Sequence, residues 1–308
     1  MKGRRGAFTL VELVVALLIT GLVMASVITL LFSVFKSYEV HQDVAEAKQR
    51  GQIALAAIQP YVLNAGLGLP ITTSAFQSAF SGNVQILPAQ QSERFRGFVE
   101  LASNKTDVVT GNATASPALW VVYSVPSGAG VRREYPDDPT TWTNPLHVKV
   151  DRYNVLNPSS NLSTNPAEMK SWISFPSASS PFRVLSYDDG AETLNLNFGA
   201  RQRVSAYDEL HFVRAAKIYV HNNMLIIDRL DGSGEHAVTE GISGLWCTFD
   251  AAGDRILTVR ILARSSTRRG NQQQGDIEGW PASASPSRSS LDSAYRYAVV
   301  SRSWRIRN

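Results

Sequence analysis

The sequence predicts an α+β protein in which one long N-terminal helix packs on a mainly antiparallel β-sheet domain. An uncharged apolar run from Leu13 to Phe35 has the length of a helix that spans a membrane. A stripe of apolar residues at helical spacing continues beyond this run. After Gly66, short apolar segments alternate with turn-forming residues and carry little helical pattern. The predicted parts are a membrane-spanning helix at 8–35, its amphipathic continuation at 36–66 and a β-rich head at 67–308.

A basic leader of residues 1–7 precedes the predicted helix. Lys2, Arg4 and Arg5 lie before the apolar run, and the positive-inside rule places this end in the cytoplasm and the head across the membrane. A secretory signal has a shorter apolar core with small residues after it, whereas here the small residues Gly6 and Ala7 come before it. This order indicates a cleavage site on the cytoplasmic side.

One carboxylate, Glu12, lies near the start of the otherwise apolar segment. A charge at the centre of a bilayer costs roughly 3 kcal/mol on insertion scales, so an unpaired carboxylate in a spanning segment requires a partner. No basic residue lies between Gly6 and Phe35.

The stretch "FTLVEL", which begins at Phe8 and follows a basic leader and a small residue, resembles the N-terminus of a type IV prepilin. The resemblance implies a type IV pilin-like fold, a cut by a prepilin peptidase between Ala7 and Phe8, and N-methylation of Phe8. It also implies that 8–35 is the polymerisation segment and that Glu12 pairs with the terminal amine of a neighbouring subunit. The residue before the cut is typically glycine in this family, so a cut between Gly6 and Ala7 is the alternative. We expect the cut after Ala7 because it keeps the family spacing to Glu12. A simpler interpretation is a single-pass membrane anchor in which Glu12 has no special role. The leader, the small residue, "FTLVEL" and the apolar run together disfavour it.

Several later stretches are similar to those of the PilW family of minor pilins, including "QRGQIALAAIQPYVLNAGLGLP", "AAKIYVHNNMLIIDRL" and "YRYAVVSRSWRIRN". This similarity implies a minor pilin that primes or supports type IV pilus assembly and sits at the fibre tip. It implies an origin in the bacterial inner membrane with a periplasmic head. The implied partners are other minor pilins, the major pilin, the inner-membrane assembly platform and a tip adhesin. The alternatives are a minor pseudopilin of a type II secretion system, a DNA-binding or adhesive pilin module, and a membrane-anchored enzyme.

The second half of the long helix is predicted from apolar residues that recur at spacings of three and four: Val44, Ala47, Gly51, Ala54, Ile58 and Val62. The polar residues between them, including Asp43, Glu46 and Arg50, are interpreted as the solvent-exposed face. We therefore expect this half to pack on the sheet of the head and to end near Asn64, with Gly66 as a left-handed cap.

Short segments with strand character fill the rest of the chain. The candidates are 83–87, 118–125, 146–155, 182–187, 193–198, 209–214, 217–221, 224–230, 244–250, 255–264 and 294–306. Asn222 and Asn223 predict a two-residue hairpin turn, because asparagine tolerates the positive φ that such a turn requires. Two stretches rich in Ser, Pro, Asn and Gly, near 154–182 and 264–293, are predicted to be long exposed loops.

Charge gives little support for nucleic-acid binding. Removing the three basic residues of the leader from the formal net charge of +4 leaves +1 for the mature chain. Arginine is locally in excess near the C-terminus. A surface that could contact nucleic acid is therefore predicted from Arg296, Arg302, Arg305 and Arg307. We favour the interpretation that these arginines keep an edge strand from pairing with other sheets.

No catalytic or cofactor-binding motif is recognisable, and the five histidines are scattered, so we predict neither enzymatic activity nor a cofactor. The lone Cys247 allows no intramolecular disulfide and is predicted to be a buried, inert thiol. Two acidic turns could supply oxygen ligands for calcium, but turn formation explains them better: Asp188, Asp189, Asp228, Asp231 and Glu235.

Overall fold

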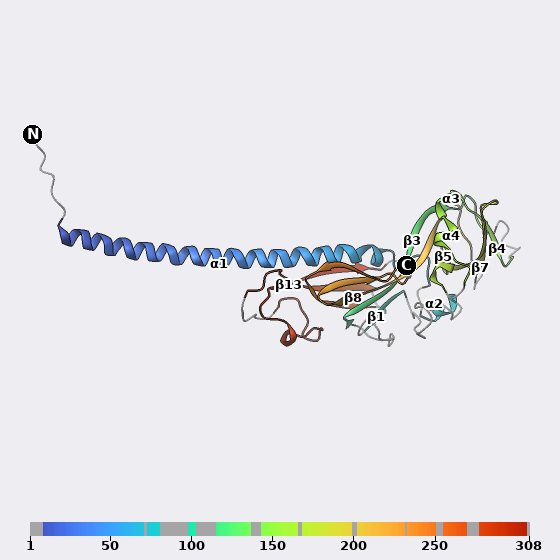
Figure 1. The fold of residues 1–308 in the computed structure, drawn as a ribbon. Helices are drawn as coiled ribbons and strands as arrows, with labels where there is room; N and C mark the ends of the chain where they lie inside the picture. The colour runs from blue at the N-terminus through green and yellow to red at the C-terminus, as the bar shows by residue number, and fades with distance from the viewer. Residues whose placement is uncertain are drawn as a thin grey trace, which may run out of the picture.

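The computed structural model describes residues 9–70, 73–80, 98–102, 115–136, 143–165, 168–198, 202–231, 233–250, 255–269 and 277–306. In this part of the chain one long helix leads into a head built from two β-sheets and a few short helices (Figure 1). All strand pairings described are antiparallel. The α+β prediction is therefore confirmed. The candidate strand at 83–87 lies outside the described residues.

Helix α1 (Leu10–Leu63) contains 54 residues and is about 80 Å long at ~1.5 Å per residue. Thr9 caps its start, and beyond Asn64 the chain turns at Gly66, where φ is +74° as the cap prediction requires. The first half of α1 extends away from the head, whereas the second half lies along it (Figure 1). The predicted apolar stripe is buried from Ala47 to Val62, and Val44 packs partly against the same core.

The smaller sheet packs directly on α1. Its strand order is β13 (Tyr297–Arg305), β12 (Ile256–Arg264), β11 (Ile242–Phe249) and β2 (Ala115–Ser116). Small residues on the buried face of the helix allow a close approach: a Cβ added at Gly51 would lie 2.7 Å from Cγ2 of Val300 on β13. This contact fixes the helix to the head along the predicted stripe.

The larger sheet runs from beside α1 to beyond its end. Its main order is β1 (Val99–Ala102), β3 (Ala118–Gly130), β8 (Glu209–His221), β5 (Trp172–Ser174), β6 (Phe182–Asp188), β7 (Thr193–Phe198) and β4 (Leu146–Lys149). Strand β9 (Met224–Asp228) also pairs with β8, and β10 (Glu235–Glu240) pairs with β9. The short helical elements are α2 (Thr73–Ala79), α3 (Tyr153–Leu156), α4 (Pro158–Asn161), η1 (Met169–Ser171) and η2 (Arg288–Ser290).

Strands β3 and β8 are 13 residues long each, and they connect two parts of the head. One part lies along α1. The other, which we call the distal lobe, contains β4 to β7, α3, α4 and the adjoining ends of β3 and β8, and it lies beyond the C-terminal end of α1 (Figure 1). The distal lobe has its own core, which includes Phe175, Phe182 and Leu196.

The structure corrects several predicted elements. The candidates at 209–214 and 217–221 form one strand, β8, because Ala215 and Ala216 are buried and continue the pairing with β3. The candidate at 146–155 ends at Lys149, and the chain then turns into α3. The hairpin turn is confirmed, with φ of 50° and 57° at Asn222 and Asn223. Strands β1, β2 and β10 were not predicted.

The two stretches predicted as exposed loops contain buried residues. In the first, β5 inserts between β6 and β8, and Ile173 and Phe175 are fully buried. In the second, Trp280 is 3% exposed and packs against Trp246 and Leu262 on the smaller sheet. The prediction of exposed loops is therefore wrong for these parts of both stretches.

Candidate functional site

The start of α1 gives Glu12 a partner within the chain. One carboxylate oxygen of Glu12 accepts hydrogen bonds from the backbone N–H and the hydroxyl of Thr9, both at 2.9 Å. The Thr9 hydroxyl in turn accepts a hydrogen bond from the Glu12 N–H at 3.3 Å. This reciprocal capping box ties the carboxylate to the end of its own helix. Sequence reasoning missed it, although the T-x-x-E spacing of Thr9 and Glu12 is its signature.

The predicted cleavage residues Gly6, Ala7 and Phe8 lie outside the described residues, so the cut after Ala7 stays a prediction. Glu12 follows Phe8 by four residues in the sequence and lies on the first turn of α1.

The first half of α1 exposes a continuous apolar surface. Its large hydrophobic side chains are 44–80% exposed from Leu10 to Phe35. Among the described residues, α1 is the one helix that is long and apolar enough to cross a membrane, and none of its most apolar window is buried in the structure. Burial in a bilayer or against other helices would remove this surface from water.

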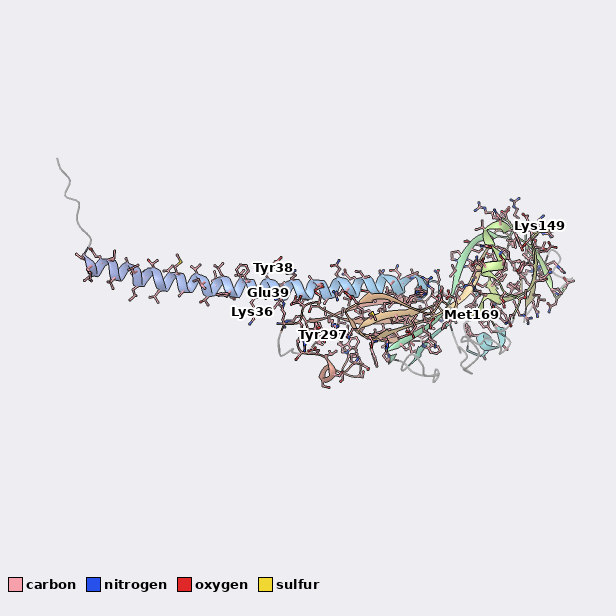
Figure 2. All side chains as sticks on the ribbon, in the orientation of Figure 1. Lys36, Tyr38, Glu39, Lys149, Met169 and Tyr297 are labelled. Atoms are coloured by element: carbon pink, nitrogen blue, oxygen red, sulfur yellow. The ribbon has the colours of Figure 1, made fainter. Side chains whose placement is uncertain are left out.

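Just beyond this apolar segment, Arg269 of the head contacts two acidic residues of α1, Glu39 and Asp43. We call this contact the clamp. The Arg269 guanidinium contacts Glu39 (Nη1 to Oε2, 2.7 Å) and Asp43 (Nε to Oδ2, 2.8 Å), one turn apart on the helix. Figure 2 labels Glu39 on α1 and Tyr297, where β13 begins, at the same end of the head. Asp43 was predicted to face solvent, but its side chain is only 4% exposed. That prediction is wrong because a residue far along the sequence covers and neutralises it.

A second contact reinforces the clamp. Glu46 accepts hydrogen bonds from the backbone N–H and hydroxyl of Ser266, at 3.1 and 2.8 Å, and forms an ion pair with Arg50 at 2.9 Å. Burial opposes ionisation of Glu46, but these hydrogen bonds and the charge of Arg50 together hold its pKa below the usual value of 4.5. The segment that follows β12 is therefore fixed to the helix at three successive acidic residues.

The C-terminal arginines do not share one open face in the described structure. Arg302 donates a hydrogen bond to Gln59 on α1 at 2.8 Å, whereas Arg305, three residues later on β13, points to the opposite face of the strand. The backbone N–H of Arg296 bonds to Ser265, and the Nε of Arg296 is buried. Arg307 lies outside the described residues. These positions give no joint surface for nucleic acid.

The remaining sequence candidates have structural roles. Cys247 is fully buried, and desolvation raises the pKa of its thiol, as expected for an inert residue. The carboxylates of Asp188, Asp228 and Asp231 accept hydrogen bonds from backbone N–H groups of their own turns. Within the described residues, no three His, Cys, Asp or Glu side chains lie close enough together to hold a metal ion.

Comparison with known proteins identifies the N-terminus. Residues 2–28 match the family described as the prokaryotic N-terminal methylation motif. No curated protein and no solved structure matches the chain. The matched residues include Glu12 and most of the apolar half of α1, and this half of the helix extends away from the head. The chain thus carries the N-terminus of a type IV pilin-like or pseudopilin-like protein, followed by an apolar helix consistent with a single-pass membrane anchor.

Proposed function

We propose that this chain is a minor pilin of the PilW type that primes or supports assembly of a type IV pilus and sits at the fibre tip. The observation that carries the proposal is the combination of an uncovered apolar helix, a single carboxylate at its start and a head fixed rigidly to its second half. Such a chain can stay in a membrane as a single subunit and can also pack its apolar half against other helices in a fibre. Its partners in that assembly are the major pilin, other minor pilins and the inner-membrane platform.

In this role Glu12 pairs with the N-terminal amine of a neighbouring subunit. In the single chain the capping box holds the Glu12 carboxylate at the start of α1, and the neighbour's amine takes the place of Thr9 when the subunits assemble. In an apolar fibre core the attraction between the two charges is weakly screened, and each compensates the desolvation of the other.

Three variants test the pairing. Glu12→Ala is expected to leave insertion and leader removal intact, but to leave the neighbour's amine unpaired at a cost of about 3–5 kcal/mol. The protein then remains in the membrane, is missing from sheared fibres and lowers the number of pili. Glu12→Gln is expected to fail less completely, because its amide oxygen still accepts a hydrogen bond.

Thr9→Val is the matched control, since it removes the capping hydroxyl and keeps the carboxylate. We expect it to enter fibres at close to the wild-type level. If Thr9→Val fails as completely as Glu12→Ala, the glutamate acts through the helix start and not through a neighbour. If Glu12→Ala enters fibres normally, pairing has no role for this subunit.

A pseudopilin of a type II secretion system is the second candidate, because the matched motif fits both classes. Deleting the gene separates them: loss of pili with normal protein secretion supports the pilus role, and the reverse supports the secretion role. Mass spectrometry of the mature N-terminus then tests the processing. We expect a methylated Phe8, whereas a chain that begins at Ala7 would place the cut after Gly6.

A further inference from the structure

Tyr207 adopts an unusual backbone conformation on the surface of the distal lobe. Its φ is +67°, in the left-handed region, and the residue is 87% exposed. Bulky side chains rarely occupy this region, and glycine or asparagine adopts it at lower cost. Because the ring packs against so little of the protein, folding gives no reason for a tyrosine here. A residue that local structure disfavours and the core does not use is a candidate for function.

The turn that carries Tyr207 is held firmly by its neighbours. The Tyr207 N–H donates to the carbonyl of Val131 at 2.8 Å, and the Val131 N–H donates to the carbonyl of Asp208 at 3.0 Å. The Asp208 carboxylate accepts hydrogen bonds from the backbone N–H and hydroxyl of Ser177. The ring is therefore presented outward on a fixed backbone, so a ligand that binds it would not have to order the turn.

Two arginines lie on three adjacent backbone segments, 130–132, 151–152 and 207–208, which we call the ribbon. Gly130 exchanges backbone hydrogen bonds with Asp151, at 2.7 and 3.3 Å, so residues 130–132 run between 151–152 and 207–208. The Arg132 side chain is 78% exposed and forms an ion pair with Asp151 at 2.8 Å. Arg152 is also exposed and has a positive φ of 57°. The Arg152 charge attracts the same Asp151 carboxylate, but among the described residues the close contact to that carboxylate comes from Arg132, and no salt bridge to the Arg152 guanidinium is formed.

The composition of this patch decides which kind of partner fits. Basic and acidic residues are intermixed on the ribbon and directly beside it: Arg132, Arg133, Arg152, Arg203, Glu134, Asp151, Asp208 and Glu209. Their balance disfavours nucleic acid, which requires a clear excess of positive charge. Tyrosine and arginine are the side chains that dominate binding energy at protein interfaces, since they supply a large contact area and directed hydrogen bonds.

The position of the patch excludes the bilayer as its partner. Tyr207 is hydrogen-bonded to Val131, the residue that follows β3, and this end of β3 lies in the distal lobe, beyond the C-terminal end of α1 (Figure 1). Figure 2 labels Lys149, which precedes Asp151 by two residues, at this end of the molecule. A membrane that contains the first half of α1 cannot reach it.

We propose that Tyr207, Arg132 and Arg152 form a docking site for a second protein of the same assembly, one that presents a carboxylate to Arg152 beside an apolar contact for the Tyr207 ring. The identity of the partner as a component of the fibre rests on the proposed function. The existence of the docking site does not.

The test places a photo-crosslinking aromatic amino acid at position 207 of the full chain in pilus-producing cells. After irradiation, fibres are sheared off and adducts are identified by mass spectrometry. We expect an adduct between this chain and another protein of the fibre fraction, and Arg152→Glu should lower its yield about tenfold or more. Arg305→Glu makes the same charge change on the smaller sheet and should leave the yield unchanged.

The thermal stability of the full chain in detergent provides the second measurement. Tyr207→Asn should keep the wild-type melting temperature, because asparagine tolerates positive φ. A fall of several degrees would show that the ring stabilises the fold and would overturn the proposal. Failure to form an adduct in fibres that contain the chain, an adduct with carbohydrate, or equal yields with and without Arg152→Glu would overturn it too. If the chain never appears in fibres but position 207 still forms an adduct that depends on Arg152, the docking site stands and the pilus role fails.

Discussion

Replacing Arg269 by alanine tests whether the clamp holds the head on α1. The change leaves the Asp43 carboxylate buried, with 4% of its side chain exposed and without the guanidinium that contacts it at 2.8 Å. Removing one member of a buried ion pair typically costs about 3–5 kcal/mol. Here the Arg269 side chain is 28% exposed, so water already screens part of the interaction. We therefore expect Arg269→Ala to lower the free energy of unfolding by about 2–3 kcal/mol.

A double-mutant cycle separates the pair from its surroundings. Asp43→Ala removes the buried charge itself and leaves Arg269 with Glu39 at 2.7 Å, so we expect a loss of only about 1 kcal/mol. The double variant should then be about as stable as Asp43→Ala, which corresponds to a coupling energy of about 2–3 kcal/mol, the whole effect of Arg269→Ala.

The measurement is denaturant unfolding of the full chain in detergent, followed by the fluorescence of its six tryptophans. Arg268→Ala is the matched control, because Arg268 is adjacent, 70% exposed and 3.7 Å from Asp292. It should change stability by less than about 0.5 kcal/mol. Equal effects of the two arginine variants would refute the argument from burial.

Three other predictions follow from single sites. Gly51→Leu should lower the free energy of unfolding by about 1–3 kcal/mol, because Val300 fills the space beside Gly51. Ala56→Leu on the exposed side of α1 should change it by less than about 0.5 kcal/mol. Equal losses in the two variants would contradict the close packing of Gly51 on Val300. Cys247 should react with an alkylating reagent only after denaturation, and mass spectrometry of the native chain checks this. Burial lowers the pKa of His211 below 6.5 even though Glu209 and Asp208 act in the opposite direction, so the unfolded chain binds the proton more readily. Stability should therefore decline as the pH falls below 6.5, and this decline should be smaller in His211→Gln; identical pH profiles would contradict it.

Features that depend on neighbours in the sequence could be predicted. The stripe from Ala47 to Val62 follows from helical periodicity, and the hairpin at Asn222 and Asn223 follows from turn chemistry. Glu12 could be recognised as exceptional because it is a charge in an apolar run. Its bond to Thr9 is equally local and was predictable from spacing.

Features that depend on distant contacts could not be predicted. Asp43 looks like a solvent-exposed residue in its helix, and only the fold brings Arg269 onto it across 226 residues of sequence. Strand β5 has three residues, too few for a periodic pattern, and a composition rich in Ser and Pro around it hides the buried Ile173. Nothing in the sequence around Tyr207 indicates that its backbone takes a left-handed conformation.

Because of the capping box, a neighbour's amine must displace Thr9 before it can pair with Glu12 in the proposed assembly. In the single chain the Glu12 carboxylate already accepts two hydrogen bonds from Thr9. It is therefore a hydrogen-bonded charge even without a neighbouring subunit. A capping interaction is worth about 1 kcal/mol, whereas the loss of a partner from a buried ion pair costs about 3–5 kcal/mol. A neighbour's amine can therefore displace Thr9 once both groups lie in an apolar fibre core, but not while water or lipid headgroups surround the helix start. The cap stabilises the separate subunit, and the change of surroundings on assembly favours the exchange of partners.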